Sequence, residues 1–465
     1  MQRLPKVTVY IVNHNYGRFL PRAIESVLNQ SLQDFELLII DDGSTDDSQA
    51  IIERYVGHPK VFPIFQQNKG LTVTNNIAMR KARGRYIMRL DADDWLDENA
   101  LTVMAGAMDQ NDALGLVFPD FYLTDESGQI IELVRRHDFR EVTLLDQPAH
   151  GACTMIRLKC LMDLGGYDEK LLCQDGYDLW IRFIEHFEVK NINLPLFYYR
   201  QHGTSLTRNE RRILDTRAQI IERHSKSKGE APSTVAIIPV RGRLLDPASP
   251  VLDKLGDRAL IDWTINAALE ARHVQRVIVT SPDPDILDHV GKFGKSVFPV
   301  LRDPRLAMLN TTLADTLLAA LEEFATTQFE PQATVVLKVE SPFRGAQYID
   351  TAIEVMVLFE TDCVIGVRPD SNQFFRHNGS GLEPIRRTAD LRLEREDLFR
   401  EAGGLHVFRT QYLKENRGVV GGRVGHVVLD QQSALYISSD WEWSVAERIA
   451  ASSPFAARSG RTPPP

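Results

Sequence analysis

The order of apolar stretches along the chain is the feature that most limits how it can fold. Residues 6–12 form a short apolar run typical of a strand, and residues 21–30 carry apolar side chains at helical spacing. The alternation continues with strand-like runs at 35–42, 60–66 and 84–94 and helical patterns at 47–56 and 72–82. Because helices between strands connect parallel neighbours, this order predicts an α/β fold built on a parallel sheet.

A second series of the same kind follows a change of composition near residue 208. Residues 208–233 combine the pattern of a charged helix with a stretch rich in Lys, Ser, Gly and Pro, which is typical of a linker. A chain of 465 residues also exceeds the roughly 250–300 residues that one core holds. We therefore predict two domains, 1–210 and 234–450, with a charged helix and linker at 211–233 and a disordered tail at 451–465.

Composition narrows the class of protein. Hydrophobic residues make up 43% and charged residues 25%, as in ordinary globular proteins, and no apolar run approaches the roughly 20 residues that span a bilayer. The N-terminus has no signal-peptide pattern, and a net charge of −9 argues against duplex nucleic acid as a partner. Four cysteines without a C-x-x-C pair are interpreted as reduced thiols, which favours a cytoplasmic location. A nucleophilic Cys173 is a disfavoured alternative.

Acidic residues cluster where predicted strands end. Asp91 and Asp93 stand two apart after the run 84–90, so an extended chain points both side chains the same way. Carboxylates at this position suit Mg²⁺ or Mn²⁺ bound to a diphosphate, although an isolated D-x-D is more often a solvated loop. Asp41 and Asp42 end an earlier strand and could accept hydrogen bonds from a ribose or a base. The alternative is that the residues after them, Ser44 or Thr45, cap the next helix.

Five segments in this order resemble the family 2 glycosyltransferases. They are VTVYIVNHNY, SVLNQS, LLIIDDGSTD, NKG and LDADDW, and the match runs from about Val7 to His202. The resemblance implies a GT-A fold, transfer of a sugar from a nucleotide-sugar donor with inversion, and help from Mg²⁺ or Mn²⁺. It places Asp42, with Asp41, at the nucleoside, Asp91 at the ribose or diphosphate, and Asp93 on the metal. Asn13 and Lys69 are further expected donor contacts.

The same resemblance implies a catalytic base. In GGYDEKLLCQDGYDLWIR the matching residue is Asp175, which would take the proton of the acceptor hydroxyl. The alternative is that Asp175 only caps the helix that follows. Two departures from the family are Gln174, where a Glu is common, and Asn75, where an Arg is common. We expect Lys69 to compensate for the missing Arg.

The segment YYRQHGTSLT resembles the closing segment of the family. It offers His202 as a metal or diphosphate ligand and Arg200 as a phosphate contact. An exposed loop histidine without such a role is the alternative for His202.

The second half resembles the cytidylyltransferases that make CMP-sialic acid. The segments are STVAIIPVRG, ALIDWTINAALEA, RVIVTSPDPDIL, VLRDPRLA, SPFR and DWEWSVAE. The resemblance implies a nucleotidyltransferase-like domain with Arg241, Gly242 and Arg302 as candidate nucleotide contacts. Leu244 and Leu245 replace the expected Ser-Lys, and the late metal carboxylates fall on Tyr436 and Ser438. Asp440 and Glu442 lie near, in a shifted register. We therefore expect a degenerate domain without phosphoryl-transfer activity.

These features predict two Rossmann-like nucleotide-binding domains and a cytoplasmic, metal-dependent glycosyltransferase of cell-surface polysaccharide biosynthesis. The donor would be a UDP-, dTDP- or CMP-sugar, with UDP the first choice, and the acceptor a glycan or a lipid- or protein-linked group. A homodimer formed through the second domain is a further expectation. One alternative is a bifunctional enzyme that also makes a CMP-nonulosonic acid from CTP. Another is a sugar-nucleotide-binding assembly module without turnover.

Overall fold

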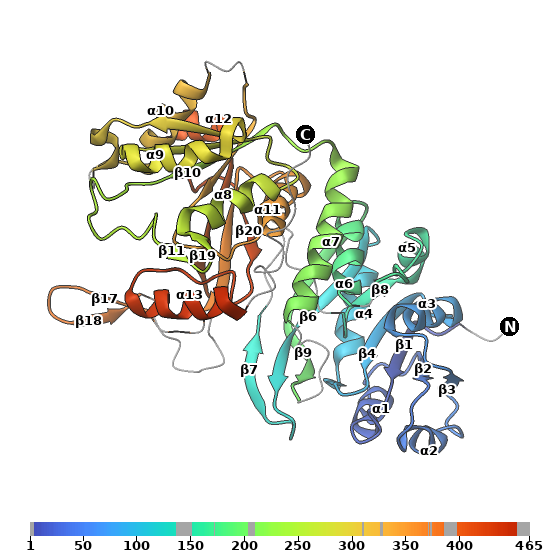
Figure 1. Ribbon diagram of the computed structural model, residues 1–465. Coiled ribbons are helices and arrows are strands. Elements are labelled where there is room, and N and C mark those ends of the chain that lie inside the picture. Colours follow the sequence, from blue (N-terminus) through green and yellow to red (C-terminus); the bar gives the residue numbers. More distant parts are fainter. Residues whose placement is uncertain are drawn as a thin grey trace. The chain divides into compact units, whose positions relative to one another are not determined.

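The chain divides into two compact units (Figure 1). The first comprises Met1–Arg217 with Gln373–Glu396, and the second comprises Ala218–Asn372 with Asp397–Pro465. The computed structural model describes residues 4–135, 151–171, 173–202, 210–308, 311–325, 329–370, 372, 374–385 and 398–452. Over these ranges, no helix is long and apolar enough to cross a membrane.

The first unit is built on a mixed sheet that begins with parallel strands. In its described part the sheet has nine strands in the order β3-β2-β1-β4-β8-β6-β9-β5, with β7 paired to β6. β1 pairs in parallel with both β2 and β4, and β2 with β3, whereas β8 is antiparallel to β4 and β6. The strands are β1 (Val7–Asn13), β2 (Phe35–Asp42), β3 (Val61–Gln66), β4 (Tyr86–Asp91), β5 (Trp95–Leu96), β6 (Leu114–Thr124), β7 (Ile130–Val134), β8 (Met155–Arg157) and β9 (Glu188–Arg200).

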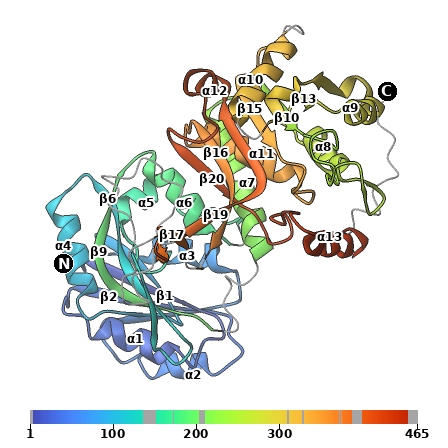
Figure 2. The same cartoon turned by 90° about the vertical axis from the view of Figure 1, so that its left-hand side faces the viewer.

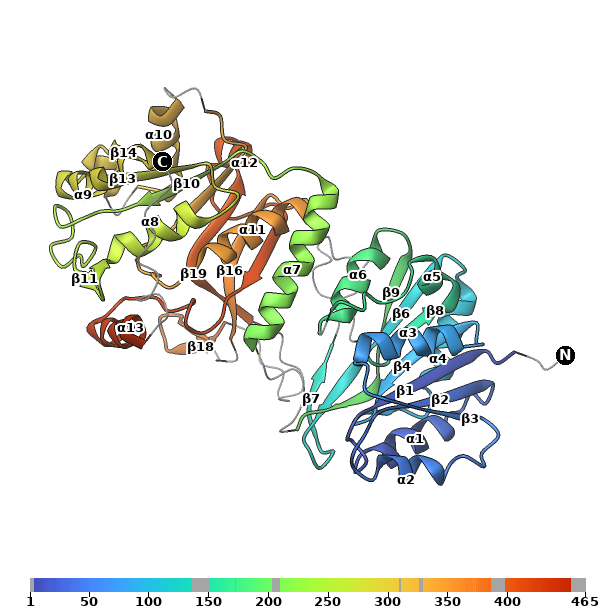
Figure 3. The same ribbon diagram turned by 45° about the vertical axis from the view of Figure 1, so that its right-hand side comes forward.

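Helices cover both faces of this sheet because alternate strand residues are apolar on both sides. Val9 and Ile11 of β1 point into one core and Tyr10 into the other. In Figure 3, α1 and α2 lie on one side and α3, α5 and α6 on the other. The helices are α1 (Leu20–Leu28), α2 (Ser48–Glu53), α3 (Leu71–Lys81), α4 (Ala100–Gln110), α5 (Leu158–Asp163) and α6 (Asp175–Ile184).

The second unit repeats the α/β plan with a different sheet. Its strands follow the order β14-β13-β10-β15-β19-β16-β20, in which β10 is parallel to β13 and β15 (Figure 2). β19 is antiparallel to both β15 and β16. The strands are β10 (Thr234–Pro239), β13 (Arg276–Ser281), β14 (Val297–Leu301), β15 (Ala333–Leu337), β16 (Cys363–Asp370), β19 (Leu398–Arg409) and β20 (Val424–Val428).

α-Helices and two small hairpins accompany these strands. The helices are α8 (Leu260–Glu270), α9 (Pro284–Val290), α10 (Leu313–Phe324), α11 (Ala346–Leu358), α12 (Thr410–Asn416) and α13 (Asp440–Ser452). The hairpins pair β11 (Lys254–Leu255) with β12 (Arg258–Ala259) and β17 (Phe375–His377) with β18 (Leu382–Pro384), the second of which is grouped with the first unit.

The predicted fold class is confirmed in both halves. The run 35–42 coincides with β2, and the charged pattern after residue 208 forms α7 (Glu210–Lys228). This helix occupies most of the predicted linker, and the division between the units falls inside it. The predicted tail lies outside the described residues, except for positions 451 and 452, which end α13.

Candidate active site

The carboxyl ends of three parallel strands bring the predicted donor residues together. The register of the sheet sets Asn13 of β1 beside Asp41 of β2, and Val12 beside Asp91 of β4. In an open α/β sheet, this is the edge at which ligands bind. The residues that the sequence placed at a nucleoside and a diphosphate therefore share one edge.

Asp41 is held by its neighbours in a buried network. Asn13 Nδ2 donates to Asp41 Oδ1 at 2.9 Å and to Ser44 Oγ at 3.0 Å, and the Ser44 amide donates to Asp41 Oδ2 at 3.1 Å. The helix α2 begins later, with Asp47 at its N-cap. Ser44 therefore fixes Asp41, and the capping alternative is not the arrangement seen.

Asp42 organises the loop after β3. Its Oδ1 accepts from the Lys69 amide at 2.8 Å and its Oδ2 from the Gly70 amide at 2.9 Å. Gly43, at φ +77°, allows this approach, because a Cβ there would lie 2.6 Å from the Asn68 amide nitrogen. The Lys69 side chain is exposed. Asp42 thus binds the main chain of the NKG segment.

The D-A-D segment meets the end of β9. His202 Nε2 lies 2.8 Å from Asp93 Oδ2, and the His202 ring packs on Tyr16 and Phe19 with centroids 5.4 and 5.1 Å apart. His202 is buried, so it is not the exposed loop histidine of the alternative prediction. Asp93 and His202 would offer an oxygen and a nitrogen ligand to a cation that replaced the hydrogen bond between them.

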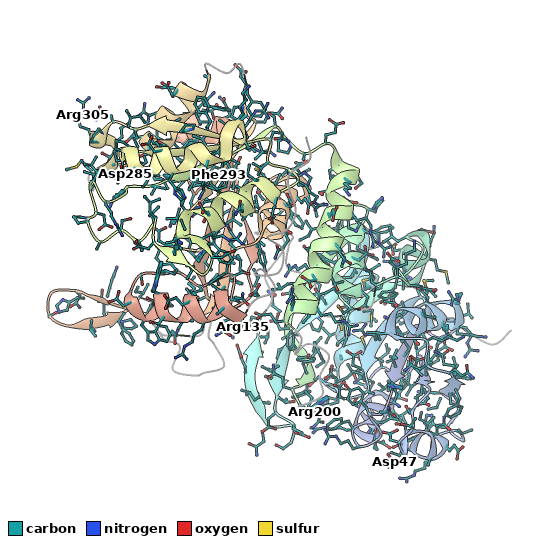
Figure 4. All side chains as sticks on the ribbon, in the orientation of Figure 1. Asp47, Arg135, Arg200, Asp285, Phe293 and Arg305 are labelled. Atoms are coloured by element: carbon teal, nitrogen blue, oxygen red, sulfur yellow. The ribbon has the colours of Figure 1, made fainter. Side chains whose placement is uncertain are left out.

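Arg200 ends β9 and is labelled in Figure 4. Its Nε donates to the Asp93 carbonyl at 2.9 Å and its Nη1 to the Glu126 carbonyl at 2.7 Å. The guanidinium also lies over the rings of Phe19 and Trp95, at 4.6 and 4.7 Å from their centroids. Arg200 therefore fixes the backbone around Asp93, and two of its nitrogens are engaged by carbonyls.

The carboxylates of the D-A-D-D segment crowd one another. Burial raises the pKa of Asp93, the negative charge of Asp91 raises it further, and the hydrogen bond from His202 opposes both. Burial also raises the pKa of Asp94, with added repulsion from Asp93. The Asp94 Oδ1 accepts from the Arg200 amide at 2.9 Å, whereas its buried Oδ2 has no hydrogen-bond partner among the described residues. A cation at this position would relieve the repulsion.

Asp175 is the first residue of α6 and reaches the same edge. The helix N-cap is Gln174, in a left-handed conformation at φ 58°, so Asp175 does not cap the helix. Its Oδ2 accepts from Asn75 Nδ2 at 3.0 Å and from Arg89 Nη1 at 3.1 Å. No contact to its Oδ1 is found within the described part of the chain. Among the described residues, one carboxylate oxygen is thus fixed and no partner is found for the other.

Two residues of this site were not predicted as site residues. Arg89 lies two positions before Asp91 on β4, which puts both side chains on one face of the strand, and that spacing was the available signal. Asn75 was noted only as a departure from the family pattern, yet its amide contacts Asp175. The cation beside Asp175 is Arg89, whereas the expected compensation by Lys69 for the missing Arg stays a prediction.

The second unit has a separate cavity with two arginines. A cavity of about 340 Å³ is lined by Arg241 and Arg302, with Lys338, Glu340 and Tyr436 among its other lining residues. Burial lowers the pKa of Arg302 to about 10, and the positive charge of Arg241 adds to this effect. Its Nη2 donates to the Val240 carbonyl at 2.7 Å. Two neighbouring cations of this kind suit an anion.

Other candidate residues of the second unit do not line this cavity. Gly242 packs on Asp283, because a Cβ at this glycine would lie 2.4 Å from Asp283 Oδ2. Glu442 accepts hydrogen bonds from Ser438 and Ser439 at the start of α13, and Asp440 is exposed. Neither Asp440 nor Glu442 is among the lining residues.

Family models match both halves of the chain. Residues 8–165 match the model described as Glycosyl transferase family 2, and residues 248–375 match the model described as Cytidylyltransferase. The first half therefore carries a family 2 glycosyltransferase domain and the second a cytidylyltransferase domain, which confirms both resemblances.

Individual relatives match the first half. A chondroitin synthase of Escherichia coli is 31% identical over 210 residues, which are 44% of this chain and 30% of that protein. An uncharacterized glycosyltransferase of Methanocaldococcus jannaschii, MJ1057, is 32% identical over 39% of this chain and 65% of its own length. The chain thus spans less than two thirds of each. The solved mannosyltransferase PcManGT of Pyrobaculum calidifontis is 19% identical, with a TM-score of 0.38 over 50% of this chain and 67% of that chain.

Proposed function

We propose that the first unit, with its family 2 glycosyltransferase domain, transfers a sugar from a nucleotide-sugar donor to an acceptor hydroxyl with inversion. Asp175 acts as the general base. Its open oxygen takes the hydroxyl proton while the acceptor oxygen forms a bond to the anomeric carbon. The bond between that carbon and the diphosphate breaks, and the electron pair leaves with the diphosphate.

The geometry of Asp175 is the observation that supports this proposal best. A helix cap would direct its oxygens to backbone amides, but Asp175 receives a side-chain amide and a guanidinium at Oδ2. A base needs a fixed orientation and an oxygen without a partner. The contacts at Oδ2 supply the first, and no partner of Oδ1 is found among the described residues. The neighbouring Asp91 belongs to the donor edge, so base and donor residues lie within one site.

The donor edge supports a nucleotide sugar. We assign Asp41, with Asn13 and Asp42, to the nucleoside, and Asp91 to the ribose or diphosphate. Arg200 and Lys69 are further candidate donor contacts. Two nitrogens of Arg200 donate to carbonyls, and the Lys69 side chain is exposed. A UDP-sugar remains our first choice of donor, and a glycan or a lipid- or protein-linked group our choice of acceptor.

We assign a divalent cation, Mg²⁺ or Mn²⁺, to Asp93 and His202. Within the described residues, no group of three or more His, Cys, Asp or Glu side chains is arranged to hold a metal alone. The crowded carboxylates and the orphaned Asp94 oxygen nevertheless fit a cation whose remaining ligands come from the diphosphate and water. When bound, the ion would offset negative charge on the leaving diphosphate.

A donor panel tests the transfer. The purified full chain is incubated with UDP-, GDP-, dTDP- and CMP-sugars and Mn²⁺, and the released nucleotide is measured. We expect release from one donor class, and loss of that release in Asp175→Asn. Absence of turnover with every donor, together with donor binding by calorimetry, would favour the alternative of an assembly module without turnover.

We further propose that the second unit binds an anion or nucleotide at Arg241 and Arg302 without making a CMP-sugar. Leu244 and Leu245 stand where the resemblance expects a phosphate-binding Ser-Lys, and Asp440 and Glu442 lie outside the cavity lining. The full chain with CTP, Mg²⁺ and nonulosonic acids should release no pyrophosphate. Release that disappears in Asp440→Ala would instead support the bifunctional alternative.

The cellular setting and the assembly of the chain are also proposals. We place the protein in the cytoplasm, in biosynthesis of a cell-surface polysaccharide, as a homodimer formed through the second unit. Light scattering on purified full chain measures the oligomeric state directly, and a monomer at micromolar concentration would contradict that part of the proposal.

A further inference from the structure

Arg89 contacts two carboxylates of the candidate active site. Its Nε lies 2.9 Å from Asp91 Oδ1, and its Nη1 lies 3.1 Å from Asp175 Oδ2. Asp91 ends the same strand, whereas Asp175 begins a helix 86 residues further along the chain. One guanidinium therefore links the donor edge of the sheet to the proposed base.

The surroundings of Arg89 hold its side chain in place. The residue is only 7% exposed, and the Cys153 amide donates to the Arg89 carbonyl at 2.7 Å. Gly151 lies against the guanidinium so closely that a Cβ there would be 2.5 Å from Arg89 Nη2. The guanidinium therefore fills the space that a side chain at position 151 would occupy.

The electrostatic balance favours a fixed charge at this point. Burial lowers the pKa of Arg89, but the negative charges of Asp91 and Asp175 outweigh that effect, so its pKa lies above the ordinary value. Arg89 is the one cation found in contact with Asp175 among the described residues. A buried carboxylate without such a partner would be strongly destabilised.

Arg89 and Asn75 contact the same oxygen of Asp175. Asn75 donates to the same Oδ2 of Asp175 that Arg89 contacts, and it adds no charge. Together the two residues fix one oxygen by a neutral donor and a charged donor and leave the other oxygen unengaged. Arg89 on β4 supplies the positive charge next to Asp175, and Asn75 on α3 supplies a neutral side-chain amide.

We infer that Arg89 is a positioning residue that fixes Asp175 relative to the donor-side carboxylate of Asp91. The inference rests on the function proposed above, and Arg89 acts through Asp175 without touching the reacting atoms. A lysine cannot replace it, because an ammonium is a single point charge and cannot bridge two carboxylates as a planar guanidinium does.

The test combines Arg89→Lys with Asp175→Asn in the full chain. Nucleotide release and donor affinity are measured with the best donor of the panel. We expect Arg89→Lys to lower kcat by about 10²-fold, the cost of a small misplacement of a catalytic group, while the Kd of the donor changes little. In the Asp175→Asn background the same change should cost almost nothing, since residues that act through one another are not additive.

A matched control is Arg83→Lys. Arg83 also pairs with a buried carboxylate, Glu36, but at the opposite end of the strands. The Arg83→Lys substitution should therefore lower stability and leave kcat unchanged. If Arg89→Lys fails to fold, Gly151→Ala displaces the same guanidinium without removing it. It is then combined with Asp175→Asn in the same double-variant comparison.

The outcomes separate the inference from the proposed function. Absence of nucleotide release by the wild-type chain with every donor refutes the proposed function. If the wild type releases nucleotide, two results would overturn the role of Arg89 and leave the proposed function standing. One is a normal kcat in Arg89→Lys, and the other is that the effects of the two substitutions multiply in the double variant. A loss confined to donor affinity would also overturn it, because the role would then be donor binding.

Discussion

A single added methyl group at Gly151 should disable the proposed base without touching it. In Gly151→Ala the new Cβ would lie 2.5 Å from Arg89 Nη2, 3.0 Å from Cζ and 3.3 Å from Nη1. Ordinary contacts begin near 3.5 Å, so the guanidinium has to retreat by about 1 Å. The hydrogen bond from Arg89 to Asp175 is already 3.1 Å long and would be lost.

Both the rate and the stability should respond. A displacement of about 1 Å at a catalytic group lowers kcat by roughly 10²-fold. Overpacking of a buried site lowers the unfolding free energy by about 1–3 kcal/mol. Alanine also reduces the conformational entropy of the unfolded chain, which raises the unfolding free energy by about 0.4–1 kcal/mol. Nucleotide release and thermal unfolding of the same preparation measure the two effects.

Gly176→Ala is the matched control, because it makes the same chemical change close to the same base. Among the described residues, the nearest atom to a Cβ at Gly176 is 3.8 Å away, which is an ordinary contact. Alanine in a helix should raise the unfolding free energy by about 0.5–1 kcal/mol and leave kcat unchanged. A Gly151→Ala variant that keeps the wild-type rate would refute the link between Arg89 and Asp175. Equal rate losses in Gly151→Ala and Gly176→Ala would also refute it, because any added methyl group near α6 would then lower the rate.

The other predictions address the base, the metal, the donor edge and the second unit. Asp175→Asn should lower transfer by roughly 10²–10⁴-fold with far less change in melting temperature, and equal activity would exclude Asp175 as the base. Asp93→Ala should abolish the Mn²⁺ dependence of donor affinity in calorimetry, and retained dependence would place the metal elsewhere. Asp42→Ala should destabilise the first unit by about 1.5–3 kcal/mol in urea unfolding, through loss of charged hydrogen bonds to Lys69 and Gly70. Hydrogen bonds from Arg272 and Lys226 lower the pKa of Glu222 to about 2, so its stabilising effect is present above the unfolded pKa of about 4.3 and disappears as the pH falls towards 2. The melting temperatures of wild type and Glu222→Gln should therefore differ at pH 7 and converge near pH 2.

The parts of the fold that depend on local pattern could be predicted from the sequence. The apolar run of β2 and its two closing carboxylates follow from residues adjacent in the chain, and so does the D-A-D segment after β4. Asp175 was predicted as the base because a segment around it resembles a known motif. In each of these cases the signal lies within a few residues.

Contacts between distant residues could not be predicted in this way. Arg89 meets Asp175 across 86 residues, and nothing in the local pattern of β4 indicates a partner on α6. Ser44 looked like a helix cap because caps and carboxylate donors are the same residue types, and only the start of α2 at Ser48 separates the two roles. A buried histidine at 202 was equally invisible, since its burial depends on aromatic rings from the loop before α1.

Asp42 holds the NKG loop by its main chain, so the conformation of the loop does not depend on the side chain at position 69. Within that loop the carboxylate accepts from the main-chain amides of positions 69 and 70, and the side chain at 69 is exposed. Substitutions at this position can therefore change the charge and length of the side chain beside the proposed donor site and leave the loop folded. Such a position is a natural starting point for retuning which nucleotide an enzyme accepts, whether by evolution or in a saturation library.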